Sequence, residues 1–180
     1  MAAAAASLPP GWRRLVAYLI DYIVFVLPLL ALLTVVGMAL ASKDADAPTL
    51  QGWTGHAVML VCLTLPVALY FAVLEASLNQ ATVGKRLMKL SVVASDGGRA
   101  SPGQTLLRVA GKLAPWEFFH AVLWHWDGWP FDPAPASSLQ MTGLLVGWVV
   151  VGVYIVSVFV GERRTPYDQL AGTSVLYRGS

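Results

Sequence analysis

Three long apolar runs constrain the fold of this chain more than any other feature of its sequence. Residues 15–41 contain one charged side chain, Asp21, residues 55–78 contain none before Glu75, and residues 141–161 contain none at all. A helix that spans a bilayer needs about 20 mostly apolar residues, and each run meets that length. The composition agrees, because 57% of the residues are hydrophobic and 12% are charged, whereas soluble domains average about 25% charged residues. We therefore expect an integral membrane protein.

The first run has a competing interpretation as a secretory signal peptide. Arg13 and Arg14 precede it, and Ala39-Leu40-Ala41 has the small residues of a cleavage site. The apolar region of a signal peptide, however, is only about 7–15 residues long. The run in this chain is much longer and contains an acid, which favours a retained span.

Residues 106–126 are the ambiguous segment, because they mix Arg108, Lys112, Glu117 and His120 with several aromatic residues. Such a segment either spans the membrane or lies in the interface as an amphipathic helix. The loops decide between the two, since cytoplasmic loops are enriched in Lys and Arg. Four spans place every base-rich stretch on one side of the membrane and the two acidic loops on the other.

The fold class that we predict is an all-α membrane protein with four transmembrane helices and a small cytoplasmic β-element. The predicted spans lie at about residues 15–41, 55–78, 106–126 and 139–161. Both termini are then cytoplasmic. Residues 1–11 form a predicted disordered N-terminal tail, and residues 12–178 form a single transmembrane domain.

The β-element is predicted from two short strand-like runs. Lys89–Ser95 alternates in polarity and carries adjacent valines, and a turn signal of Asp96-Gly97-Gly98 follows it. Thr173–Tyr177 has a similar pattern. Because neither run would be stable alone, we expect them to pair. Helix-start signals at Ser101 and Thr165, each followed by proline, precede the third span and the second strand.

Three sequence segments together resemble the RDD family of bacterial membrane proteins, which is named for an arginine and two aspartates. The segments are WRRLVAYLID at residues 12–21, ATVGKRL at residues 81–87 and YDQLAGT at residues 167–173. The second has Val83 where the family usually has proline, and the third has Tyr167 where the family usually has histidine. Their order and spacing carry the resemblance, which extends over nearly the whole chain.

The resemblance maps the family's named residues to Arg14, Asp21 and Asp168. It implies a multi-pass protein of the bacterial cell (inner) membrane. Some members of the family are implicated in sodium–proton exchange, but the activity of most is unknown. The resemblance therefore implies a location more firmly than a reaction.

Two acids lie within the predicted spans, where charged groups are costly and usually mark ion pairs or transport pathways. We expect Asp21 to pair with Lys112 or Arg86 of another segment, either as a structural ion pair or as a titrating site. Glu75 lies near the cytoplasmic end of the second span, where a hydrogen bond to a neighbour is the simpler interpretation.

Glu117 and His120 lie on one face of the third predicted helix. The spacing Glu-x-x-His occurs in metal sites of helical bundles, but those sites need two copies and further glutamates. We therefore predict a Glu–His hydrogen bond or a proton relay, and no metal. His56 and His125 should lie near the outer surface, away from the carboxylates.

A basic patch is predicted at Lys85, Arg86 and Lys89, facing anionic lipid headgroups on the cytoplasmic side. Gly84-Lys85 does not form a P-loop, because the required upstream glycine and the following Ser or Thr are missing. Asp168 either caps its own helix or pairs with Arg14 or Lys85. Arg108 and Lys112 should extend toward the cytoplasmic surface along their aliphatic stems.

Two functions are consistent with these residues. In the first, Asp21, Glu75, Glu117 and His120 form a path for protons or small cations, which at four spans would require a homo-oligomer. In the second, the protein is a non-transporting scaffold or accessory subunit whose buried charges hold the helices together. No catalytic set of nucleophile, base and orienting group is visible, so we expect no enzyme, no cofactor and no nucleic-acid partner. The lone Cys62 also excludes an intramolecular disulfide.

Overall fold

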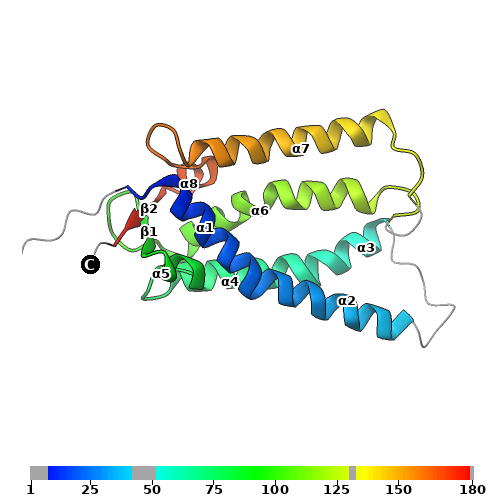
Figure 1. Ribbon diagram of the computed structural model, residues 1–180, viewed down its shortest axis with the longest axis horizontal. Coiled ribbons are helices and arrows are strands. Elements are labelled where there is room, and N and C mark those ends of the chain that lie inside the picture. Colours follow the sequence, from blue (N-terminus) through cyan, green and yellow to red (C-terminus); the bar gives the residue numbers. More distant parts are fainter. Residues whose placement is uncertain (1–7, 42–51, 130–132, 179–180) are drawn as a thin grey trace, which may run out of the picture.

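The computed structural model describes residues 8–41, 52–129 and 133–178. Its helices run roughly along one long axis, and its small elements gather at one end (Figure 1). The first long helix consists of α1 (Gly11–Asp21), a π-helical turn (Tyr22–Val26) and α2 (Leu27–Ala41). The second consists of α3 (Gly52–Met59), a π-helical turn (Leu60–Thr64) and α4 (Leu65–Ala76).

The other elements follow in the order α5 (Val83–Leu87), β1 (Leu90–Ala94), α6 (Pro102–Trp124), α7 (Ser138–Ser157), α8 (Pro166–Leu170) and β2 (Thr173–Tyr177). Within the described residues, three helices are long and apolar enough to cross a membrane, namely Gly11–Leu40, Gly52–Ala76 and Ser138–Ser157. These correspond to three of the four predicted spans. The first seven residues of the predicted disordered tail lie outside the described residues, while Pro9 is buried and Gly11 begins α1.

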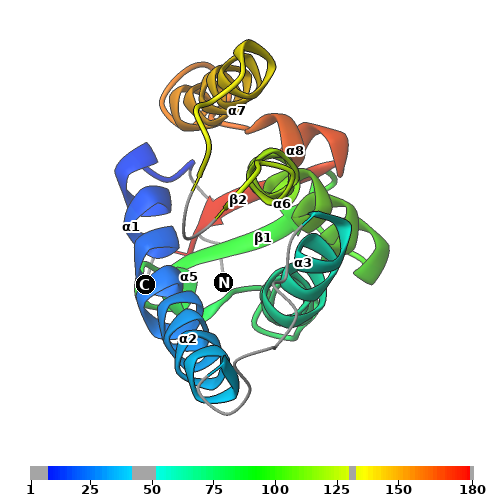
Figure 2. The ribbon, with the colours of Figure 1, turned by 90° about the vertical axis from the view of Figure 1, so that its right-hand side faces the viewer.

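Helix α6 matches the predicted third span in place but is too polar to count among these three. It has 23 residues, about 35 Å at 1.5 Å per residue, and lies between α7 and the second long helix (Figure 2). It starts at a capping box, in which Ser101 accepts from Gln104 N and Gln104 accepts from Ser101 N. The helix-start signal in the sequence is therefore confirmed.

Prolines explain the irregular turns of the long helices. A proline inside a helix lacks an N–H donor and its ring clashes with the carbonyl group four residues earlier. The residues four before Pro28 and Pro66 lie in the two π-helical turns, whose wider spacing relieves this clash. In α6, Pro115 frees the carbonyl of Gly111, which accepts a hydrogen bond from the Tyr154 hydroxyl at 2.9 Å. This bond connects α6 to α7.

The main core lies between the two long helices and α6. Its buried members are Val26, Leu63, Val67, Phe71, Val109 and Leu113. Large apolar side chains on the opposite faces of the long helices and α7 are exposed. A soluble protein would bury such faces, whereas helices in lipid expose them.

The predicted strand pair is confirmed. β1 and β2 form an antiparallel two-stranded sheet in which Leu90 lies opposite Tyr177 and Ala94 opposite Thr173. One face of this sheet packs against Ala17 of α1 in a second small core. The sheet, α5 and α8 therefore form one unit with the start of α1, which we call the basic end of the bundle (Figure 1).

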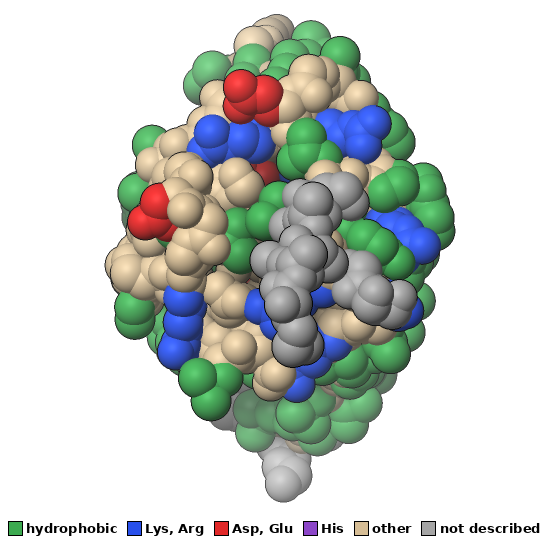
Figure 3. All heavy atoms as spheres, turned by 90° about the vertical axis from the view of Figure 1, so that its left-hand side faces the viewer, with side chains coloured by type: hydrophobic (Ala, Val, Ile, Leu, Met, Phe, Trp, Pro, Cys, Tyr) green, Lys and Arg blue, Asp and Glu red, His purple; other side chains and the backbone are tan. Residues whose placement is uncertain are grey.

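The basic end takes its name from its surface. Figure 3 views this end and shows mostly Lys and Arg among the charged side chains. The exposed bases near the sheet are Arg86, Lys89, Arg99 and Arg178, against the exposed acids Asp96 and Glu162. Arg178 donates to Gln80 and so connects the last strand to the loop before α5.

Candidate functional site

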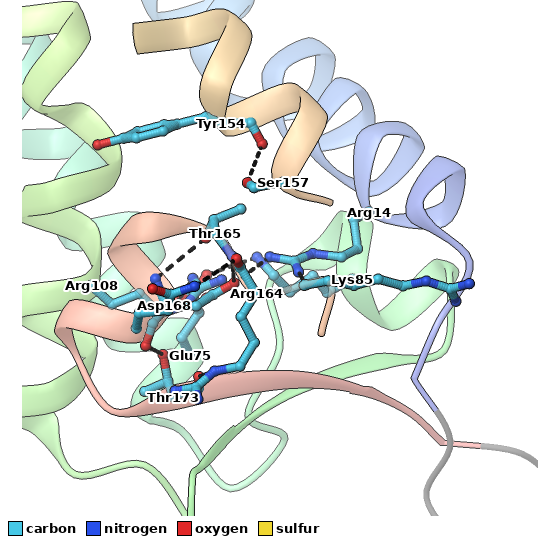
Figure 4. Close-up of polar contacts among 12 residues, drawn as sticks. Arg14, Glu75, Lys85, Arg108, Tyr154, Ser157, Arg164, Thr165, Asp168 and Thr173 are labelled. Carbon is cyan, nitrogen blue, oxygen red and sulfur yellow. Dashed lines mark hydrogen bonds and ion pairs between the residues drawn. The ribbon is translucent and has the colours of Figure 1, made fainter. Parts of the chain in front are cut away.

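A chain of buried ion pairs connects five elements near the basic end. Asp168 of α8 accepts from Arg14 of α1 at 2.5 Å and from Arg108 of α6 at 2.8 Å. Glu75 of α4 accepts from Arg108 at 2.6 Å and from Lys85 of α5 at 2.7 Å. We call these five residues the charge network. Figure 4 shows their side chains converging from separate elements.

The charge network is almost entirely shielded from solvent. Glu75 and Asp168 are 0% exposed, and Arg108 is 2% exposed. Each carboxylate receives two bases, and Arg108 contributes to both carboxylates. Removing one partner from a buried ion pair typically costs about 3–5 kcal/mol, because the other charge is left uncompensated. The network therefore couples the five elements strongly.

Asp168 has both of its predicted roles. Its carboxylate accepts from the backbone N of Thr165, completing a capping box at the start of α8, and it pairs with Arg14. Burial by itself would raise the pKa of the Asp168 carboxyl, but Arg108 and Arg14 beside it hold that pKa well below its usual range. The second aspartate of the sequence motif is therefore a permanent anion at neutral pH.

Asp21 is also fully buried, but its predicted partners are wrong. Its carboxylate accepts from the Tyr70 hydroxyl at 2.8 Å, the Thr82 hydroxyl at 2.6 Å and the Gly84 backbone N at 2.7 Å. Neutral donors thus replace the expected ion pair with Lys112 or Arg86. Arg86 instead donates to the Ala81 carbonyl.

The segment at residues 81–87 explains how Asp21 is held. Thr82 caps α5 and also donates to Asp21. At Gly84 a Cβ atom would lie only 2.0 Å from the Ala17 carbonyl O, so only glycine lets α5 approach α1 this closely. The next residue, Lys85, points to Glu75. Three of the four positions from Thr82 to Lys85 therefore each make a different contact.

Glu117 forms a second polar group farther along α6. It receives the predicted hydrogen bond from His120 at 3.1 Å and another from the Thr64 hydroxyl. His56 Nε2 lies 3.4 Å from the same carboxylate, so the prediction that His56 lies away from the carboxylates is wrong. The side chain of Glu117 is 24% exposed, in contrast to Asp21 and Glu75.

Two predictions about basic residues also need correction. Lys85 is 7% exposed and ion-paired with Glu75, so it does not belong to a lipid-facing patch with Arg86 and Lys89, which are exposed. Arg108 does not extend to the surface but joins both carboxylates of the network. Sequence reasoning missed these contacts because the partner lies on another helix in each case.

The predicted path residues therefore fall into separate groups. Asp21 bonds to neutral donors of α4 and α5, Glu75 belongs to the charge network, and Glu117 with His120 bonds to Thr64. Among the described residues, no side chain bonds to the carboxylates of two of these groups. No group of three or more potential metal ligands occurs in the described part of the chain.

Arg14, Asp21 and Asp168 belong to the three sequence segments described above, and their contacts hold α1, α5, α6 and α8 together. The same segments allow the chain to be assigned to a family. A model of the RDD family matches residues 8–172. The chain belongs to the RDD family. Comparisons with curated proteins and with solved structures found no match. In this RDD protein the arginine and the second aspartate of the name form one ion pair, and the first aspartate anchors α5 to α1.

Proposed function

We propose that this RDD protein is a four-span, multi-pass protein of the bacterial inner membrane with both termini in the cytoplasm. Helix α6 lies beside the three apolar helices, and Arg108 and Glu117 of α6 have partners inside the protein, which lowers the cost of placing them in a bilayer. The bases exposed at the basic end are those expected on a cytoplasmic face. Exposed Arg86 and Lys89 would meet anionic headgroups there.

Its function, in this proposal, is that of a non-transporting scaffold or accessory subunit. The observation that carries the proposal is the burial and the hydrogen bonding of two carboxylates of the predicted path, Asp21 and Glu75. Asp21 and Glu75 are 0% exposed, and every hydrogen bond they accept comes from a side chain or backbone group of another packed segment. A carried cation would have to displace several of these donors at once.

Flux measurements in proteoliposomes test this proposal. We expect vesicles holding the purified protein, an internal pH-sensitive dye and a sodium gradient to show no more proton movement than empty vesicles. Addition of a sodium–proton ionophore then verifies that the gradient was intact. Sodium-dependent proton flux that disappears in folded Asp21→Asn protein would contradict the scaffold function.

Proton or cation exchange is the second candidate function, and the group at Glu117 is the observation that favours it. The partly exposed Glu117 carboxylate contacts the ring nitrogens of His56 and His120, so a carboxylate and two proton-carrying imidazoles adjoin one another. In the same vesicles, flux that persists in Asp21→Asn but is lost in Glu117→Gln would support exchange through this group. Such exchange would fit a homo-oligomer, because transporters with few spans usually combine repeats.

A further inference from the structure

A cavity of about 340 Å³ lies between α1, α6 and α7. Four bases line it, namely Arg14, Lys85, Arg108 and Lys112, and no acid does. The rest of its lining is largely aromatic and aliphatic. Along α6 the basic residues lie nearer the basic end, and Trp116 and Phe119 lie farther along the helix. The cavity is therefore polar at one end and apolar at the other.

Lys112 is the base in this cavity without a counter-ion. Among the described residues it has no hydrogen bond and no ion pair, and its ammonium lies 3.2 Å from the ring centroid of Phe71 and 4.8 Å from that of Tyr18. Contacts with aromatic faces stabilise a cation only modestly. An anion bound in the cavity would stabilise the Lys112 ammonium more than these aromatic rings do.

The pairing of charges around the cavity also calls for one anion. Three of the four bases that line the cavity, Arg14, Lys85 and Arg108, are paired with Glu75 or Asp168 of the charge network. The positive charge of Lys112 is left without an acid paired to it among the described residues. Uncompensated charge is costly at membrane depth, and a singly charged anion would neutralise it.

The apolar part of the cavity opens on the faces of the long helices. Leu15 of α1, Trp116 of α6, and Trp148 and Ile155 of α7 line the cavity, yet they are 38–65% exposed. In a bilayer these exposed faces contact acyl chains. A small soluble anion has no apolar part to place against this wall, whereas the acyl chain of a lipid packs along it without leaving apolar surroundings.

We propose that this cavity binds one anionic phospholipid, with its phosphate at Lys112 and an acyl chain along the wall formed by Trp116 and Trp148. The single charge of a phosphodiester matches the single positive charge of Lys112. The site is distinct from the exposed surface around Arg86 and Lys89. It does not depend on whether the protein acts as a scaffold or as an exchanger.

Native mass spectrometry of the detergent-purified full chain tests the proposal, with phosphatidylglycerol, phosphatidylcholine and the soluble anion glycerol phosphate as probes. We expect one phosphatidylglycerol per chain, retained in preference to phosphatidylcholine, and no retained glycerol phosphate. Lys112→Met should weaken phosphatidylglycerol binding by about tenfold or more, as expected for the loss of a charged hydrogen bond. The matched control, Lys89→Met, removes the same charge from an exposed site outside the cavity and should leave binding unchanged.

A second variant keeps the proposal testable if Lys112→Met does not fold. Trp148→Ala removes an exposed side chain of the apolar wall without touching the charge network, and it should weaken binding of phosphatidylglycerol. Equal retention of phosphatidylcholine, or unchanged binding in both cavity variants, would overturn the proposal. Retention of glycerol phosphate would overturn the proposal and assign the site to a soluble anion. A dimer whose formation excludes the lipid would also overturn it and assign the cavity to contact with a second copy of the chain.

Discussion

At the residue scale, the two motif aspartates, Asp21 and Asp168, have partners of different charge. Asp168 sits between two arginines, whereas Asp21 is held by two hydroxyls and one backbone N–H. Both are fully buried. The arrangement at Asp168 needs a charged carboxylate, because its partners are charged. The arrangement at Asp21 needs mainly acceptor oxygens within reach of three neutral donors.

The donors around Asp21 predict a difference between two substitutions. Asp21→Ala leaves three buried donors without an acceptor, and each unsatisfied donor costs about 1–3 kcal/mol. Asp21→Asn keeps one acceptor oxygen. We expect the yield of monodisperse protein after detergent extraction to fall more for Ala than for Asn. Normal and equal yields for both would show that Asp21 does not hold α5 against α1.

The depressed pKa of Asp168 predicts how stability depends on pH. A carboxyl whose pKa is lower in the folded than in the unfolded protein adds stability above the unfolded value, about 3.9 for Asp, and loses it as the pH falls toward the folded value. We expect the melting temperature of the wild-type protein to exceed that of Asp168→Asn by a constant margin between pH 7 and about pH 5. That margin should shrink below about pH 4. A margin that is already lost at pH 6 would contradict the ion pairs described for Asp168.

At the element scale, local signals in the sequence predicted where the helices and strands lie, but they did not predict the contacts between these elements. The two strands, the capping boxes at Ser101 and Thr165 and the places of the long helices follow from turn chemistry and hydropathy. The burial of Arg108 and the approach of His56 to Glu117 do not, because they depend on how separate helices pack. Pro28 and Pro66 indicate a local irregularity in the two long helices but not its π-helical form, because Pro115 lies inside α6 without such a turn.

The approach of α5 to α1 predicts the effect of a single methyl group. In Gly84→Ala the new Cβ would overlap the backbone of Ala17, and the backbone cannot move away as a flexible side chain would. We expect a loss of about 1–3 kcal/mol or more in unfolding free energy, measured by denaturation in micelles. Gly37→Ala is the matched control, since a Cβ at Gly37 meets nothing within 4 Å and should cause no loss.

At the scale of the whole molecule, the sheet and the charge network both lie at the basic end of the bundle. The proposed four-span topology places this end in the cytoplasm and the α6–α7 connection outside. In a Cys62→Ala background, we expect an impermeant thiol reagent to label Ala134→Cys in intact spheroplasts. Asp96→Cys, in the turn after β1, should be labelled only after permeabilisation. Labelling of both positions from outside would contradict the topology.

The central claim is that the buried charges of this RDD protein act together to hold its elements in place. A double-mutant cycle with Glu75→Gln and Arg108→Met measures this directly, as unfolding free energies in micelles. We expect the double variant to lose less than the sum of the single variants, with a coupling energy of about 0.5–3 kcal/mol. The control cycle pairs Arg108→Met with Glu117→Gln, which share no contact, and should be additive. Additivity in the Glu75–Arg108 cycle would contradict the claim.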